Sequence, residues 1–153
     1  MTDEVAELAP RLRRFSVEIA ATPGAVFDCW CRFEEFPRFS PGVLRVKQID
    51  PSRVLWEALD AMGRRRLWES QILERVPGHR LAWRNVSGSN NAGWVELSPL
   101  PSSRTRLELC LNYQPNGFLE RVADAFGWID AGIQRDLCSF GRFAESAASR
   151  RQL

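Results

Sequence analysis

The chain has 153 residues, of which 44% are hydrophobic and 26% are charged, so its length and composition indicate one folded domain rather than a disordered chain. Its 21 basic and 19 acidic residues are spread along the sequence and leave a formal net charge of +2, which argues against a nucleic-acid partner. No segment approaches the roughly 18 uninterrupted apolar residues of a transmembrane helix, and the N-terminal segment is too acidic for a secretory signal, so we expect a cytoplasmic protein.

The N-terminal segment differs from the rest of the chain. Residues 1–12 contain Pro10 and show neither strand nor helix periodicity, so we expect a flexible or loosely docked segment. No linker, repeat or low-complexity segment follows, and residues 13–150 are therefore predicted to form a single domain.

One strand and two short helices are predicted next. Apolar and polar residues alternate over 14–20, as in a half-buried strand. Thr22 and Pro23 supply an N-cap and a proline at the first helical position, which predicts a helix to about residue 32. Trp30 falls on the buried side of this helix, and a short phenylalanine-rich helix broken by Pro37 follows it.

The second half of the chain combines a strand-rich region with one long helix. Short turn segments separate six stretches of period-two alternation, which favours antiparallel pairing of neighbours. The strands are predicted at residues 43–49, 53–60, 64–73, 80–86, 93–97 and 105–113, and the helix at 118–149. A seven-stranded sheet must curve around this helix to bury both apolar faces, so the predicted class is α+β with the short helices closing one end.

Metal and redox chemistry lack the usual residues. His79 is the only histidine and follows a turn dipeptide, which excludes a histidine-based triad. The four cysteines are scattered without zinc or redox spacing, so we expect reduced thiols and no metal or organic cofactor.

Several short motifs occur in a characteristic order along residues 14–145. They include Phe36-Pro37-Arg38-Phe39, Trp56-Glu57-Ala58, Arg80-Leu81-Ala82-Trp83 and the segment from Gly88 to Gly93. In this order the sequence resembles the START-like (SRPBCC) superfamily, in particular its polyketide cyclase/dehydrase branch and the coenzyme-Q-binding proteins. The resemblance implies a helix-grip fold with an internal cavity for a hydrophobic ligand. It does not decide between an enzyme and a carrier.

Strand parity predicts which side chains face the concave side of the sheet. Trp56, Trp68 and Trp83 fall on this face of neighbouring strands. They form either a packed aromatic core or the flat walls of a ligand pocket. We expect a cavity of ~300–1,000 Å³ between the sheet and the long helix, lined by these tryptophans and Leu109.

Charged residues also fall on inward-facing positions. Arg64 and Arg66 share the concave parity, and Asp130 lies near the apolar stripe of the long helix. Arg66 and Asp130 are predicted to face one another across the cavity, since a buried arginine needs a partner. The alternatives are a solvated hairpin edge for the arginines and an aspartate that reaches water.

Cyclisation of a polyketide-type intermediate requires a proton acceptor and a donor that stabilises the developing oxyanion. Arg66 is the candidate donor, and Asp130 or Tyr113 the candidate proton handler. Cyclases of the resembled family often use several tyrosines, whereas Tyr113 is the only tyrosine here. The predicted ligand-binding residues are Trp30, Trp56, Arg64, Trp68, Ser70, Trp83, Asn85, Thr105, Leu109, Phe126 and Ile133.

Three functions remain open. The first is a cofactor-free polyketide cyclase or dehydratase, with an acyl carrier protein docking beside Arg64-Arg65-Arg66. The second is a non-catalytic carrier or chaperone for a quinone, isoprenoid or lipid. The third is an interaction module that uses Trp94 and Trp128, which fall on outward-facing positions and are candidate contacts for a homodimer or another partner.

Overall fold

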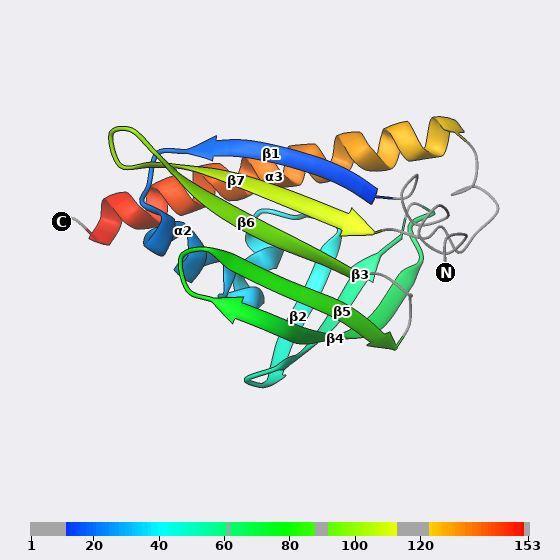
Figure 1. The fold of residues 1–153 in the computed structure, drawn as a ribbon. Coiled ribbons are helices and arrows are strands. Elements are labelled where there is room, and N and C mark those ends of the chain that lie inside the picture. Colours follow the sequence, from blue (N-terminus) through cyan, green and yellow to red (C-terminus); the bar gives the residue numbers. More distant parts are fainter. Residues whose placement is uncertain (1–11, 61, 88–91, 113–122, 152–153) are drawn as a thin grey trace, which may run out of the picture.

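A computed structural model describes residues 12–60, 62–87, 92–112 and 123–151, with side chains described from residue 130 onward in the last range. Residues 1–11 of the predicted N-terminal segment, Tyr113 and the first residues of the predicted long helix lie outside these ranges. Figure 1 shows one sheet curving over the long C-terminal helix, with short helices at one end.

The elements follow the predicted order. They are β1 (Leu12–Ile19), α2 (Pro23–Trp30), the 3-10 helix η2 (Phe33–Arg38), β2 (Val43–Asp50), β3 (Arg53–Leu59), β4 (Arg65–Val76), β5 (Arg80–Ser87), β6 (Ala92–Leu100), β7 (Arg104–Asn112) and α3 (Ala123–Arg151). All neighbouring strands pair antiparallel, in the sheet order β1-β7-β6-β5-β4-β3-β2. The predicted seven-stranded antiparallel sheet and long helix are therefore confirmed.

The end of β6 differs from the prediction. The predicted strand ends at residue 97, but β6 continues to Leu100, and Pro99 pairs with Thr105 inside the β6–β7 hairpin. β5 pairs with β6 only as far as Glu96, so the missing N–H of Pro99 breaks no hydrogen bond to β5. The turn instead uses Ser102 and Ser103, both with positive φ.

The first helix begins where the capping residues predict. The Thr22 Oγ1 atom accepts a hydrogen bond from the Ala25 amide at 3.4 Å, and Pro23 occupies the first turn. Val26, Phe27 and Trp30 are buried, so α2 turns its apolar side toward the sheet. This orientation carries Trp30 into the interior.

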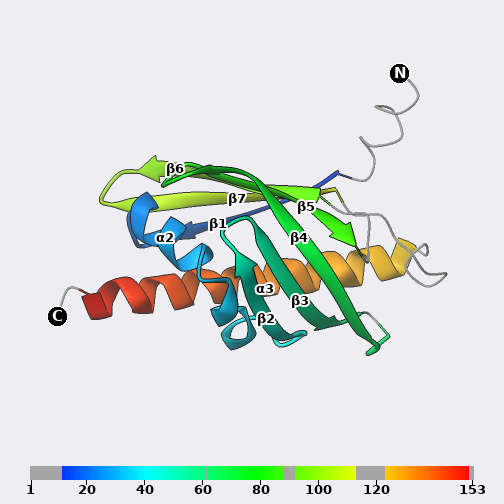
Figure 2. The same cartoon turned by 90° about the horizontal axis from the view of Figure 1, so that it is seen from below.

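The core fills the space between α3 and the strands β1, β6 and β7. Phe140 is fully buried, and a Cβ atom at Gly141 would lie 3.4 Å from the Ile19 side chain, so helix and strand approach closely. Leu109 packs in the same core, as does the partly buried Ile133. Figure 2 shows α3 running beneath these strands. The described apolar side chains of α3 and of these strands pack together there as one core.

Candidate functional site

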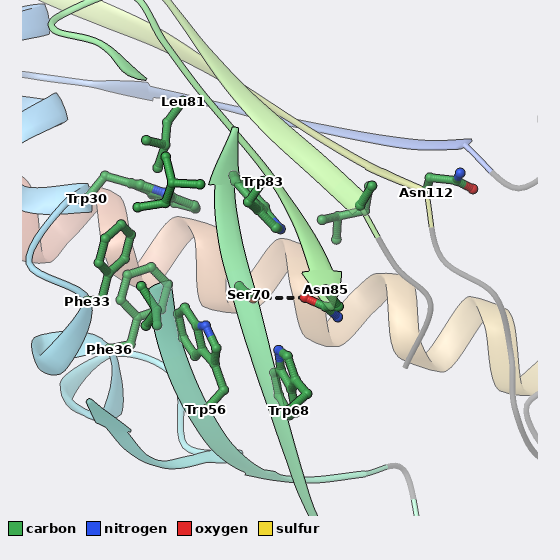
Figure 3. Close-up of a pocket in the computed structure, with 14 residues that line it drawn as sticks. Trp30, Phe33, Phe36, Trp56, Trp68, Ser70, Leu81, Trp83, Asn85 and Asn112 are labelled. Carbon is green, nitrogen blue, oxygen red and sulfur yellow. Dashed lines mark hydrogen bonds between the residues drawn. The ribbon is translucent and has the colours of Figure 1, made fainter. Parts of the chain in front are cut away.

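A pocket of about 210 Å³ lies between the concave face of β3–β7 and the short helices α2 and η2 (Figure 3). Its lining residues are Trp30, Phe33, Phe36, Val54, Trp56, Trp68, Ser70, Ile72, Leu81, Trp83, Asn85, Ala92, Leu111 and Asn112. None of the α3 residues with described side chains is among them, and Phe126, the predicted contact from the first part of α3, lies outside those residues. The volume is below the predicted range, because aromatic rings from α2 and η2 occupy part of the space.

One end of the pocket is aromatic. The ring centroids of Trp30 and Phe36 are 5.3 Å apart with nearly perpendicular planes, and those of Phe36 and Trp56 are 5.1 Å apart in the same arrangement. Phe33 adds a further edge contact to Trp56 at 6.3 Å. Such edge-to-face contacts stabilise one arrangement of the rings. The helices α2 and η2 thus close this end with interlocked aromatic side chains.

The tryptophans of the sheet supply flat walls. Trp56 and Trp68 are register partners on β3 and β4, and their indole planes are parallel to within 4° at a centroid distance of 6.1 Å. The ring centroid of Trp83 on β5 lies 6.4 Å from that of Trp30, and the two ring planes are inclined by 30°. Parallel aromatic surfaces suit a planar ligand better than a branched one.

The other end of the pocket is polar but uncharged. Ser70 Oγ donates a hydrogen bond of 2.8 Å to Asn85 Oδ1, and the two residues are register partners on β4 and β5. Ser70 is only 5% exposed, so the hydrogen bond offsets the cost of burying its hydroxyl group. Figure 3 shows this pair apart from the aromatic end formed by Trp30, Phe33 and Phe36.

The predicted arginines lie outside the lining. Arg64 Nε and Arg66 Nε contact the same oxygen, Asp60 Oδ2, at 3.2 and 3.0 Å, and both arginine side chains are mostly exposed. We call these three residues the Asp60 cluster. Burial raises the pKa of Asp60, but hydrogen bonds from the Arg64 backbone and the Arg66 side chain outweigh it and hold the pKa below its usual value. The solvated-edge alternative therefore describes both arginines.

The predicted pair of Arg66 and Asp130 is not formed. Asp130 Oδ1 lies 3.9 Å from Arg13 Nε of β1, while Arg66 pairs with Asp60. This part of the prediction was wrong because strand and helix periodicity give the direction of a side chain but not its nearest opposite charge. α3 packs along β1, and Asp130 finds its partner there.

Other predicted site residues have structural contacts. Thr105 is fully buried, and its Oγ1 donates a hydrogen bond of 2.7 Å to the Ala21 carbonyl, so it does not reach the pocket. Leu109 and Ile133 belong to the core beside α3 and are not among the lining residues. The side chain of Phe126 and all of Tyr113 lie outside the described residues, as does the side chain of Trp128. Trp94 is half-buried, with the Arg80 guanidinium 5.2 Å from its ring centre.

The sequence prediction omitted several lining residues. Phe33 and Phe36 were assigned to a short helix, and their three-residue spacing was the available signal of a shared face. Ala92 and Asn112 are register partners at the ends of β6 and β7, on the parity assigned to the outer face. Strict alternation therefore misses this pair, although both residues line the pocket.

The pocket offers hydrogen bonds and apolar contacts but no ionisable side chain from the described residues that line it. Within the described ranges, no three His, Cys, Asp or Glu side chains are grouped closely enough to hold a metal ion. No helix in the described part of the chain is long and apolar enough to span a membrane.

The comparisons with known proteins agree with this architecture. The family model described as polyketide cyclase / dehydrase and lipid transport matches residues 19–134. An uncharacterized 17.2 kDa protein of Streptomyces lincolnensis is 29% identical over 131 residues, covering 85% of this chain and 87% of its own.

Two solved structures show the same fold. The Zhui aromatase/cyclase from Streptomyces sp. R1128 has a TM-score of 0.70 at 19% identity, over 94% of this chain and 96% of its own. A START superfamily protein from Mycobacterium smegmatis has a TM-score of 0.71 at 15% identity, over 91% and 97% of the two chains. The predicted helix-grip fold is thereby confirmed.

Proposed function

The chain belongs to the polyketide cyclase/dehydrase and lipid transport family, and on that premise we propose that it binds a planar, polyketide-type intermediate and assists its cyclisation or dehydration. The observation that carries this proposal is the pocket, with aromatic walls at one end and the Ser70–Asn85 hydrogen bond at the other. An aromatase/cyclase of the same fold supports the assignment of the substrate class.

The main contribution of such a pocket is to hold a flexible, reactive chain in one folded conformation. Restricting the ligand between Trp56, Trp68 and Trp83 brings reacting carbons together and converts ring closure into a favourable intramolecular step. The Ser70 hydroxyl donates to Asn85 Oδ1 and so orients the amide, and the Asn85 N–H groups are the proposed donors to a carbonyl oxygen of the bound ligand, the role that the sequence predicted for Arg66.

Proton transfer requires a further group. Tyr113 shares the sequence parity of the lining residue Leu111, and we keep it as the proposed proton handler. Arg66 and Asp130 are not included in the proposed polar centre, because each has its own ion-pair partner outside the pocket lining. An acidic acyl carrier protein remains a proposed partner, with the exposed Arg64, Arg65 and Arg66 side chains as its docking site.

A second candidate function is a non-catalytic carrier for a quinone, isoprenoid or other hydrophobic molecule. The lack of ionisable side chains among the described lining residues favours this alternative, because acid–base catalysis requires a titrating group. A carrier needs only apolar walls and enough polar contacts to orient its ligand.

Turnover and binding measured together distinguish the two functions. Wild type, Ser70→Ala and Tyr113→Phe are incubated with a reactive poly-β-ketone, and products and ligand affinity are determined. For a cyclase we expect the product yield to fall ~10²-fold or more in Tyr113→Phe, while affinity changes much less. Ligand binding without any change in product profile by wild type would favour the carrier. No binding of any planar apolar ligand would refute both.

A further inference from the structure

Two polar atoms in the pocket lack hydrogen-bond partners among the residues that the structure describes. Trp56 Nε1 and Asn112 Oδ1 are both buried without such a partner, and both residues line the pocket. A buried, unsatisfied polar group costs free energy, so such groups in a binding pocket indicate what the ligand must supply. The indole N–H donates only, and therefore requires a hydrogen-bond acceptor. The Asn112 amide can offer its oxygen or, turned by 180°, its N–H groups.

These polar atoms restrict how a ligand can lie in the pocket. Trp56 contacts Phe33 and Phe36 at the aromatic end, and its indole is parallel to that of Trp68 on the next strand. In Figure 3 the Trp56 side chain lies between the aromatic end and the Ser70–Asn85 pair. A ring system bound along these walls therefore passes the Trp56 N–H, and an oxygen atom on the ring system can accept its hydrogen bond.

The volume restricts the ligand further. A cavity of about 150 Å³ holds a single benzene ring, whereas drug-sized ligands occupy ~300–1,000 Å³. The observed 210 Å³ lies between these values and accommodates one or two fused rings rather than an extended multi-ring product. The described lining also lacks a cation that would compensate a carboxylate or phosphate, so the bound molecule is neutral.

We propose that the pocket selects a neutral one- or two-ring ligand that carries a carbonyl oxygen, and that Trp56 determines this selectivity by donating its indole N–H to that oxygen. This inference rests on the proposed binding of a planar hydrophobic ligand and narrows its chemical class. Saturated acyl chains and pure hydrocarbons leave the Trp56 N–H without an acceptor and are disfavoured.

A pair of probes of nearly equal shape tests this selectivity. 2-Acetylnaphthalene carries a carbonyl group, and 2-isopropenylnaphthalene replaces the carbonyl oxygen with a CH₂ group. Their dissociation constants are measured by calorimetry for wild type, Trp56→Phe and the matched control Trp68→Phe. The control removes an indole from the same stacked pair, but its Nε1 is not one of the buried unpartnered atoms.

For each variant, the ratio of the two dissociation constants cancels the effect of the substitution on ring packing, because both probes have the same ring system. We expect Trp56→Phe to reduce the preference for the ketone by about threefold to tenfold, the range for one hydrogen bond, and Trp68→Phe to leave the preference unchanged. Equal ketone preference in wild type and Trp56→Phe would overturn the role of Trp56 while leaving hydrophobic binding intact. Failure of both probes to bind wild type would overturn the proposed function and this inference with it.

A measurement on wild type covers the case in which Trp56→Phe does not fold. The assigned indole ¹H resonance of Trp56 is followed while each probe is added. We expect a downfield shift with 2-acetylnaphthalene and none of that kind with 2-isopropenylnaphthalene. The same response to both probes would contradict the proposal.

Discussion

Two positions on one face of β4 differ in chemistry. Arg66 and Ser70 have the same strand parity, four residues apart. Arg66 has a half-exposed side chain and joins the Asp60 cluster, whereas Ser70 is buried in the pocket and bonded to Asn85. Charge is placed where water solvates it, and a neutral hydrogen bond is placed where water is excluded. An inward parity alone therefore does not make an arginine a pocket residue.

The largest effect is expected from a substitution that adds a side chain to the closely packed wall of the pocket. A Cβ atom at Gly93 would lie 2.8 Å from the Cys110 carbonyl oxygen and 2.9 Å from the Trp83 ring. We expect Gly93→Ala to lower the free energy of unfolding by ~1–3 kcal/mol through overpacking and to weaken ligand binding by displacing Trp83. Chemical denaturation and probe titration measure the two effects.

Gly24→Ala is the matched control, because a Cβ atom at Gly24 in α2 meets nothing within 4 Å. Alanine is a better helix former, so this variant is expected to be unchanged or slightly more stable. Equal behaviour of the two variants would show that the wall at Gly93 is not closely packed.

Removing the buried hydrogen bond is expected to have the next largest effect. Ser70→Ala takes the hydroxyl donor away from Asn85 Oδ1, and the free energy of unfolding should fall by ~1–3 kcal/mol. The double variant with Asn85→Leu should recover part of this loss, because both polar partners are then absent. No loss in Ser70→Ala would mean that the pair does not stabilise the pocket.

Substitutions in the Asp60 cluster should change the free energy of unfolding less. Arg66→Met removes an ion pair whose arginine side chain is 53% exposed, so the stability change should be ~0–1 kcal/mol. Ligand affinity should not change, since Arg66 is outside the lining. A large loss of affinity in Arg66→Met would return this residue to the site and contradict the observed separation.

The dependence of stability on acidic pH also tests the contribution of the surface carboxylates. Hydrogen bonding to Arg53 lowers the pKa of Asp50 to about 2, and the Asp60 pKa is also lowered. A pKa below the unfolded value means that the unfolded state binds protons more readily, so this stability is present above pH ~4 and is lost toward pH 2. Asp60→Asn should reduce this pH dependence of unfolding. An unchanged profile would show that Asp60 does not contribute.

Ligand affinity should not vary between pH 5.5 and 8.5, because the described lining residues contain no titratable side chain. This is the smallest expected effect, and fluorescence titration across the range measures it. A sigmoidal change in the dissociation constant would identify an ionisable group that contacts the ligand.

Strand periodicity was sufficient to predict most of the fold and the aromatic wall. The alternation that placed Trp56, Trp68 and Trp83 on one face follows from pleat geometry, which operates within each strand. The closing of the pocket by Phe33 and Phe36 depends on how η2 packs against the sheet, a tertiary contact that short helix patterns do not encode.

The charged partners were not predictable in the same way. Asp130 was assigned to Arg66, although Arg13 of β1 lies beside it in space. Ion-pair choice depends on which strand borders a helix flank, and several surface arginines compete for each carboxylate. Neutral pairs such as Ser70 and Asn85 are better constrained, because register on adjacent strands brings them together.

A ¹H–¹⁵N spectrum of the tryptophan indole groups during titration with 2-acetylnaphthalene tests most directly whether the pocket is the ligand site. Trp30, Trp56, Trp68 and Trp83 line the pocket, whereas Trp94 lies outside the lining and contacts Arg80. We expect the four lining resonances to shift and saturate together, with Trp94 unchanged. A saturable shift at Trp94 without shifts at the four lining tryptophans, or no shift at all, would contradict ligand binding in this pocket.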